Sequence, residues 1–338
     1  MNQAEAVIDR VASDDGHAAA AARPAADAIR VGFIVGPTGV GKSAAAMALA
    51  ERLDAEIVNA DSRQVYRGMN IGTAKPGAED RRRVPHHLLD IRAIDEPLDV
   101  AEFLQLARAA IVEIASRGRN VMVVGGSGFY LRVLRGGIFA GPAAAPELRR
   151  ELEALAVAHG AEYLHARLAE VDAPSAERIG RRDLYRIVRA LEVFRLTGQP
   201  ISAHQQSHRF AAREYETLTV GFAMERERLY ESINRRFDEM VERGLVEEVR
   251  ALLEAGCDPG AAPLRTVGYR QIAAAVRGEM TLGEAIELAK RDTRRLAKRQ
   301  LTWFRGDPEV VWVDAERGLQ EAFSLLGAFF ARPRSASR

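Results

Sequence analysis

The sequence has a single cysteine, Cys257, in 338 residues. One cysteine forms no internal disulfide and builds no cysteine-cluster zinc site. Long apolar runs are also missing, since none approaches the roughly 20 residues that a membrane-spanning helix needs. The N-terminus lacks the basic start followed by an apolar stretch that is typical of a secretory signal. We therefore expect a cytoplasmic protein that does not act at a membrane.

Charge of one sign is not in excess either. The 48 Lys and Arg residues face 47 Asp and Glu residues. Net charge therefore neither favours nor excludes a nucleic-acid partner, and local clusters have to decide. The length exceeds what one compact core usually holds, so we expect two parts.

Short apolar runs alternate with segments of helical spacing. We predict strands at residues 31–35, 56–61, 120–124, 217–222 and 310–313, and helices at 42–53, 100–116, 226–255 and 282–304. Strands joined through helices, with glycine turns at the strand ends, are typical of a doubly wound sheet. The sequence thus predicts an α/β fold with a parallel sheet core. Ligands of such sheets bind beyond the carboxyl ends of the strands.

The middle of the chain is different in character. It is rich in Arg, Glu, Ala and Leu with helical spacing, and we interpret it as an all-helical insertion domain. The predicted parts are a disordered tail at 1–29, a catalytic core at 30–139 and 216–325, the insertion at 140–215 and a C-terminal tail at 326–338.

A phosphate-binding loop follows the first predicted strand. Its residues are Gly36, Pro37, Thr38, Gly39, Val40, Gly41, Lys42 and Ser43. Glycines let backbone N–H groups converge on phosphate oxygens, the lysine adds a positive charge, and the serine hydroxyl can hold Mg²⁺. The loop predicts a P-loop NTPase-like core and a phosphate ligand, with Ser43 as the metal-binding residue, but does not say which phosphate compound binds.

Two features argue against a motor or signalling ATPase. The strand at 120–124 ends in Gly125-Gly126-Ser127, where such proteins carry an acid. The acid stands instead at Asp61, at the end of the preceding predicted strand. A carboxylate there suits a general base that takes a proton from an attacking group.

The segment from Asp61 to Pro76, DSRQVYRGMNIGTAKP, is long and unusual. Together with the P-loop it closely resembles tRNA dimethylallyltransferases, the IPP transferase family. Further segments match in the same order, at residues 85–90, 124–130, 189–193, 267–271 and 294–303. The resemblance extends over residues 31 to about 315.

The resemblance implies transfer of a dimethylallyl group from dimethylallyl diphosphate to N6 of the adenosine 3′-adjacent to the anticodon. The P-loop with Mg²⁺ would then hold the pyrophosphate leaving group, whose charge grows as the C–O bond breaks. Asp61 would accept the proton of the amine. The implied catalytic residues are Asp61, Ser127, Lys42 and Arg236.

The family also implies a tRNA partner, with the insertion gripping the anticodon stem-loop. We expect a monomer, because the insertion already supplies the partner surface. Two arginine-rich stretches, at 178–195 and 290–299, have the local positive charge that tracks phosphates. Gln64 could recognise the adenine. The implied tRNA contacts, some of them in the segment 293–300, include Asp61, Ser62, Arg63, Gln64, Arg149, Tyr185, Arg186, Arg189, Arg265, Gly268, Tyr269, Arg270, Arg294, Arg295, Lys298 and Arg299.

Three other functions fit parts of the sequence. An adenylate isopentenyltransferase would prenylate free AMP, ADP or ATP with a similar core. A P-loop kinase or ATPase acting on RNA would hydrolyse ATP. A non-enzymatic RNA-binding protein would use the basic faces alone.

Overall fold

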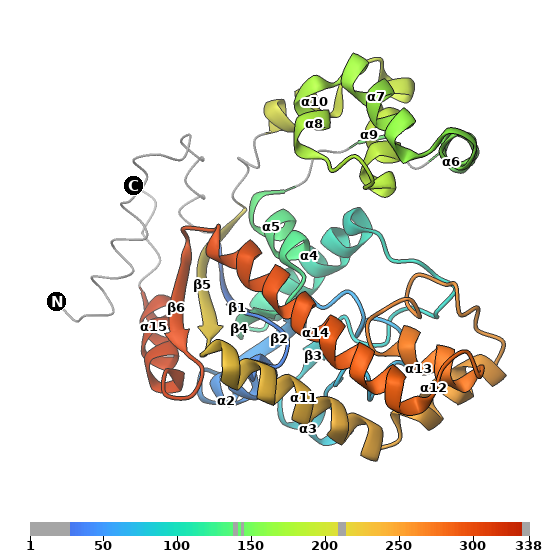
Figure 1. Cartoon of the computed structure of the whole chain (residues 1–338). Helices are drawn as coiled ribbons and strands as arrows, with labels where there is room; N and C mark the ends of the chain where they lie inside the picture. Colours follow the sequence, from blue (N-terminus) through green and yellow to red (C-terminus); the bar gives the residue numbers. More distant parts are fainter. Residues whose placement is uncertain (1–27, 138–140, 143–144, 209–213, 333–338) are drawn as a thin grey trace, which may run out of the picture. The chain divides into compact units, whose positions relative to one another are not determined.

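We describe the fold from a computed structural model of the chain, which describes residues 28–137, 141–142, 145–208 and 214–332. The chain divides into two compact units (Figure 1). The first comprises Met1–Arg135 and Arg213–Arg338, and the second comprises Gly136–Ala212. The sequence placed the insertion at 140–215. Tyr215, however, is buried and opens a strand of the first unit, because its side chain packs with the sheet.

The first unit contains a six-stranded sheet in which every pair of neighbouring strands is parallel. The strand order is β3-β2-β4-β1-β5-β6. The strands are β1 (Ile29–Val35), β2 (Ala55–Asn59), β3 (His86–His87), β4 (Asn120–Val124), β5 (Tyr215–Ala223) and β6 (Val310–Asp314). The parallel α/β fold predicted from the sequence is confirmed. β3 was not predicted, because two residues give no periodic signal.

Helices occupy the connections between the strands, as parallel pairing requires. Those of the first unit are α2 (Lys42–Arg52), α3 (Ala78–Arg83), α4 (Val100–Ser116), α5 (Gly128–Gly136), α11 (Arg226–Glu242), α12 (Leu245–Glu254), α13 (Tyr269–Val276), α14 (Leu282–Arg305) and α15 (Leu319–Ala331), of which α5 reaches one residue past the boundary. The helix predicted at 226–255 is two helices. Gly244 separates them with a φ of 98°, a left-handed conformation that glycine adopts without strain.

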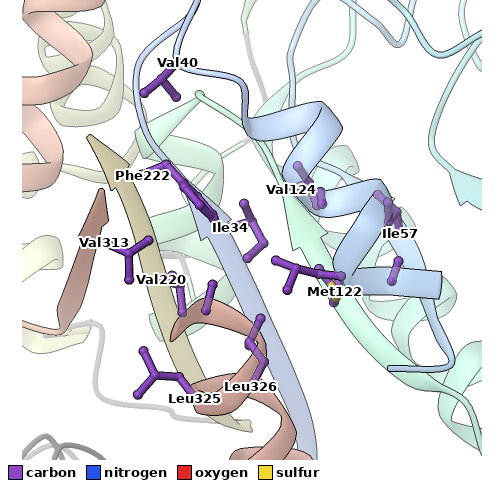
Figure 2. Close-up of a cluster of buried hydrophobic side chains, with 14 of the residues drawn as sticks. Ile34, Val40, Ile57, Met122, Val124, Val220, Phe222, Val313, Leu325 and Leu326 are labelled. Carbon is purple, nitrogen blue, oxygen red and sulfur yellow. The ribbon is translucent and has the colours of Figure 1, made fainter. Parts of the chain in front are cut away.

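The described residues of this unit include two large hydrophobic clusters. The first packs the sheet against α2 and α15, with Ile34, Met122 and Phe222 among its central side chains (Figure 2). The second lies among α11 to α14 and includes Val65, Tyr269 and other residues outside the sheet. It buries the start of the Asp61–Pro76 segment and so fixes the backbone that follows β2.

The two predicted tails need correction. Leu326 and Phe329, assigned to a C-terminal tail at 326–338, are buried in the sheet core as part of α15. Their apolar side chains gain more by covering the sheet than they would in water. The predicted disordered tail at 1–29 lies outside the described residues up to position 27, and Ile29 already belongs to β1.

Helices are the regular secondary structure among the described residues of the second unit. These helices are α6 (Pro146–His159), α7 (Ala161–Val171), α8 (Ala173–Arg178), α9 (Leu184–Thr197) and α10 (Ile201–His208). Leu152, Leu164, Leu168 and Ile187 form its own core. Among the described helices of the whole chain, none has the length and apolar character needed to cross a bilayer.

Candidate active site

The phosphate-binding loop lies between β1 and α2, and its shape depends on three glycines. Gly36, Gly39 and Gly41 have φ angles of 142°, 82° and 91°. A Cβ on Gly36 would lie 2.6 Å from the carbonyl oxygen of Phe222, and one on Gly39 would lie 2.6 Å from Ile233 Cγ1. The loop is therefore packed tightly against β5 and α11, and a side chain at Gly36 or Gly39 would clash with them.

Lys42 opens α2 directly after the loop. Its ammonium donates a 2.6 Å hydrogen bond to the carbonyl oxygen of Pro37. Desolvation in the cavity wall and the nearby positive charge of Arg236 lower its pKa to about 7, against an opposing contribution from Asp61. Burial also lowers the pKa of Arg236, while Asp61 and Glu239 raise it, and a guanidinium stays protonated at neutral pH. Two cationic groups thus share one low-dielectric site with one carboxylate.

Asp61 stands two residues beyond the end of β2, where hydrogen bonds define its position. Its Oδ1 accepts the N–H of Arg63 at 2.8 Å, and its own N–H donates to Asn59 Oδ1 at 3.2 Å. The hydroxyl oxygen of Ser127 accepts the N–H of Ser62 at 3.2 Å. The turn after β4 is therefore tied to the turn after β2, and the backbone that carries the Asp61 carboxylate is held by hydrogen bonds.

A cavity of about 700 Å³ opens at this edge of the sheet. The predicted residues that line it are Thr38, Gly39, Lys42, Ser43, Asp61, Arg63, Gln64 and Arg236. Ser127 does not line it and acts on the cavity through its bond to Ser62. The structure therefore brings together in one cavity three of the four side chains that the resemblance marked as catalytic.

Gln64 lines the cavity, and one end of its side-chain amide is bonded to the protein. Its Nε2 donates to the carbonyl oxygens of Thr73 and Ala74, at 3.0 and 3.3 Å. Two carbonyl acceptors can be satisfied only by the NH₂ end of the amide, which settles the side-chain orientation. The NH₂ end is therefore already bonded to the protein, and the hydrogen-bond acceptor Oε1 is the end of the amide left for a ligand.

Glu248 holds the loop that carries these carbonyl groups. Its carboxylate accepts the N–H groups of Asn70, Ile71 and Gly72 at 3.0, 2.8 and 3.3 Å. The hydroxyl of Tyr269 donates to the same carboxylate at 2.5 Å. Tyr269 is completely buried, so it packs the loop in place and does not offer the tRNA contact implied by the resemblance. Gly268 is buried beside it.

The remaining predicted contacts of this unit lie on α13, α14 and the loop before α13. Arg265, Arg270, Arg295, Lys298 and Arg299 are exposed. Arg270 also bonds to Asp292 at 2.9 Å. Arg294 is half-buried, because it donates to Asn234 Oδ1 at 2.6 Å. The basic face predicted from the sequence is therefore present on α14, although Arg294 points inward from it.

In the second unit, Arg149 and Arg189 bind a shared carboxylate. Arg149 holds Glu192 through bonds of 2.9 and 3.0 Å, and Arg189 adds one of 2.6 Å. Glu192 is completely buried. Burial raises its pKa, but the hydrogen bonds from both arginines and from the N–H of Ala145 outweigh this effect and lower it. Both arginines therefore have a structural partner, whereas Tyr185 and Arg186 are exposed.

Replacing Glu192 by alanine should destabilise the second unit by about 3 kcal/mol, because two partly buried arginines lose their common acceptor. The stability difference between the variant and the wild type should shrink as the pH falls through the lowered pKa of the Glu192 carboxyl. Protonation of Glu192 then removes the same stabilisation from the wild type. Urea unfolding monitored by circular dichroism measures this difference. The matched control is Glu151→Ala, which removes an exposed pair with Arg195 and should cost less than about 1 kcal/mol. Equal losses in the two variants would contradict this role of Glu192.

Gly125 provides a second stability prediction. A Cβ at this position would lie 2.3 Å from the carbonyl oxygen of Ala60, so Gly125→Ala should force the ends of β2 and β4 apart. We expect a loss of about 1–3 kcal/mol together with reduced activity, because Asp61 follows Ala60. The control, Gly283→Ala in α14, has no atom within 4 Å of the added methyl group and should be neutral or stabilising. Thermal melting of both variants tests this, and an unchanged Tm for Gly125→Ala would refute it.

No metal centre is built from side chains alone in residues 28–137, 141–142, 145–208 and 214–332, which contain no group of three or more His, Cys, Asp or Glu residues able to hold an ion. Ser43 lines the cavity. A Mg²⁺ ion often takes few protein ligands and completes its shell with water and phosphate oxygens. The residues present fit an ion that is bound together with a phosphate ligand.

The fold and the cavity define a class of protein: a P-loop α/β protein whose phosphate site adjoins a carboxylate at the next strand end. The comparisons with known proteins identify the family. The family model described as IPP transferase matches residues 64–307. The chain belongs to this family, and the resemblance predicted from its motifs is confirmed.

Individual relatives agree with this assignment. The chain is 50% identical over 301 residues to a tRNA dimethylallyltransferase of Geobacter metallireducens, covering 89% of this chain and 97% of that protein. It is 51% identical over 283 residues to one from Syntrophobacter fumaroxidans, covering 84% and 83% of the two chains.

Solved structures are similar as well. A tRNA isopentenylpyrophosphate transferase of Bacillus halodurans matches with a TM-score of 0.66 and 39% identity, covering 89% of this chain and 96% of that chain. A eukaryotic dimethylallyltransferase acting on tRNA matches with a TM-score of 0.77 and 26% identity, covering 92% and 82%.

Proposed function

We propose that this chain is a tRNA dimethylallyltransferase, which transfers a dimethylallyl group from dimethylallyl diphosphate to N6 of the adenosine 3′-adjacent to the anticodon and releases diphosphate. The observation that carries the proposal is the cavity in which Lys42, Arg236 and Asp61 meet. The two cations match an anionic leaving group, and the carboxylate matches an attacking group that must lose a proton. The curated relatives named tRNA dimethylallyltransferase support the same activity.

The reaction breaks one C–O bond and forms one C–N bond. As the donor's C–O bond breaks, its electron pair stays with the pyrophosphate, whose growing charge is stabilised by Lys42, Arg236 and the loop N–H groups. The adenine amine attacks the allylic carbon. Asp61 accepts the proton released from nitrogen, so that a poor nucleophile becomes a neutral product.

Two groups complete the site in this proposal. Ser43 would hold a Mg²⁺ ion jointly with the pyrophosphate, and the ion would supply further charge neutralisation. Gln64 Oε1 would accept an N–H of the base, since its Nε2 is already engaged by Thr73 and Ala74. A base must leave its stack to reach such a cavity.

The RNA would be held by the exposed cations of α14, namely Arg295, Lys298 and Arg299, and by the arginine-rich insertion with its exposed Tyr185 and Arg186. An enzyme for free adenylates needs no such second unit, and this favours RNA as the acceptor. We also propose that the enzyme acts as a monomer in the cytoplasm, because the insertion already supplies the second RNA-binding surface. Light scattering with and without RNA tests the oligomeric state.

The decisive experiment compares three acceptors with radiolabelled dimethylallyl diphosphate and Mg²⁺. Label should pass to an anticodon stem-loop RNA with the target adenosine, and neither to the same RNA with guanosine in its place nor to AMP. Transfer to AMP alone would favour the adenylate enzyme. Release of phosphate from ATP without prenyl incorporation would favour an RNA-dependent ATPase. RNA binding without either reaction would leave the non-enzymatic alternative.

A further inference from the structure

The side chain of Gln300, near the C-terminal end of α14, points into the active-site cavity and not onto the basic face of its helix. Its Oε1 accepts the backbone N–H of Thr38 in the phosphate loop at 2.8 Å. Its Nε2 donates to the carbonyl oxygen of Gly126, in the turn after β4, at 3.0 Å. Residues 293–300 were assigned from the sequence to tRNA contact, so this placement gives Gln300 a different task.

The two ends of the Gln300 amide have different partners: the oxygen faces a hydrogen-bond donor, and the NH₂ group faces an acceptor. A backbone N–H can bond only to the oxygen end, and a backbone carbonyl only to the NH₂ end, so the orientation is fixed. A Cβ on Gly126 would lie 2.5 Å from Gln300 Nε2, so the glycine at this position makes room for the contact. Gln300 is therefore committed to the protein backbone and fills the gap between two loops.

The hydrogen bonds continue from the turn after β4 to the carboxylate. Ser127, the residue after Gly126, accepts the N–H of Ser62 at 3.2 Å, and Ser62 is the neighbour of Asp61. A continuous path therefore leads from the phosphate loop through Gln300 to the turn after β4, and from there to the turn after β2. The loop that would hold the leaving group and the turn that holds the base are joined through two side chains, Gln300 and Ser127.

We propose that Gln300 is a positioning residue that fixes the distance between the phosphate loop and Asp61, so that donor and acceptor meet in line. The inference rests on the proposed transferase function. In this reaction the donor carbon must face the amine while its leaving oxygen faces Lys42, so both ends of the donor have to be aligned at once. A misplacement of about 1 Å between reacting groups can cost about 100-fold in rate.

The position of Gln300 on α14 gives the proposal a second consequence. The same helix carries the exposed cations proposed to contact RNA, Arg295, Lys298 and Arg299. Because Gln300 alone among these side chains reaches the phosphate loop, its loss should affect the chemical step and the donor site while leaving the RNA-binding face unchanged.

The test uses two substitutions of nearly equal size in the full-length protein. Gln300→Met keeps the side-chain volume and removes both hydrogen bonds. Gln300→Glu keeps the acceptor for the N–H of Thr38. It replaces the donor to the Gly126 carbonyl oxygen by a second oxygen, which repels that carbonyl, and it adds negative charge beside the phosphate site. The matched controls are Gln320→Met and Gln320→Glu, because Gln320 is exposed on α15 and its side chain bonds to Arg52, at 3.2 Å.

We expect Gln300→Met to lower kcat by about 10- to 100-fold, with KM for stem-loop RNA within about twofold of the wild type. Gln300→Glu should in addition weaken the binding of Mg²⁺ with inorganic pyrophosphate, measured calorimetrically, by about tenfold or more. The controls should match the wild type in all three measurements. Circular dichroism and Tm of each variant establish that it is folded.

Three outcomes would overturn the inference. Folded Gln300 variants with wild-type kcat and pyrophosphate affinity would show that the contacts do not position the site. A raised KM for RNA as the sole change would return Gln300 to the RNA surface. A lowered Tm with normal kcat for the folded fraction would leave it a purely structural role. Absence of transfer by the wild type, with intact pyrophosphate binding, would instead reject the proposed function.

Discussion

Replacing Asp61 by asparagine should lower the rate of dimethylallyl transfer by about 10²- to 10⁴-fold, the usual contribution of a general base. The amide retains an oxygen that can accept the N–H of Arg63, as Oδ1 of the aspartate does at 2.8 Å. The turn after β2 should therefore keep its shape. What is lost is a group able to take the proton of the amine as the C–N bond forms.

The control for this substitution has the same local geometry outside the cavity. Asp258 accepts the N–H of Gly260 through its Oδ1, also at 2.8 Å and two residues along the chain. Asp258→Asn should retain full activity, which separates the loss of a base from the loss of a turn carboxylate. Single-turnover transfer to stem-loop RNA measures the rate, and filter binding measures RNA affinity. If Asp61→Asn transfers at the wild-type rate, Asp61 is not the base.

Replacing Lys42 by methionine should reduce kcat/KM for dimethylallyl diphosphate by about 10²- to 10³-fold, the cost of removing one charge-stabilising donor from a preorganised site. Methionine keeps much of the apolar stem, so that α2 should pack as before. Affinity for inorganic pyrophosphate should fall with it, whereas RNA affinity should not. Lys290→Met is the matched control, because Lys290 is bound to Asp238 at 2.7 Å outside the cavity. Pyrophosphate binding unchanged in Lys42→Met would refute this role.

The lowered pKa of Lys42 adds a pH dependence to the same measurement. With a pKa of about 7 in the free protein, the ammonium is charged below pH 7 and increasingly neutral above it. Since a pyrophosphate binds the charged form, kcat/KM for the donor should fall as the pH rises past about 7, by up to about tenfold per pH unit. Lys42→Arg keeps its charge and should lack this decline. Protonation of dimethylallyl diphosphate affects both proteins equally and cancels in the ratio of their kcat/KM values. A ratio that stays constant between pH 6 and 9 would therefore contradict the pKa assigned to Lys42.

Local sequence signals located the chemistry of this protein. The phosphate loop needs three glycines with left-handed or otherwise unusual φ angles within six residues, and such a pattern is visible without any tertiary information. Asp61 could be placed because a carboxylate directly beyond a short apolar strand must lie at the ligand-binding edge of a parallel sheet. The regular helices were readable wherever their apolar spacing was sustained, as in residues 100–116, which form α4.

Contacts between distant residues could not be predicted in this way. Gln300 bonds to Thr38 across 262 positions, and Glu248 bonds to Asn70 across 178. A glutamine or glutamate on an amphipathic helix has no local feature that tells an inward from an outward role. For the same reason, Tyr269 and Gly268 were placed at the RNA surface, although the packing of α12 and α13 buries them.

The sequence by itself determined the phosphate loop, the carboxylate that faces it, the parallel sheet and the family, because each depends on residue types at short spacing along the chain. Only the tertiary structure decided which of the polar side chains meet in the cavity, which arginines already hold Glu192, and which single amide joins the phosphate loop to the turn beyond β4. The first and the third depend on how α11, α12 and α14 pack beside the sheet, and the second depends on how α6 packs against α9 in the second unit. That packing is set by many weak apolar contacts between distant segments, and the pattern within any one segment does not contain it.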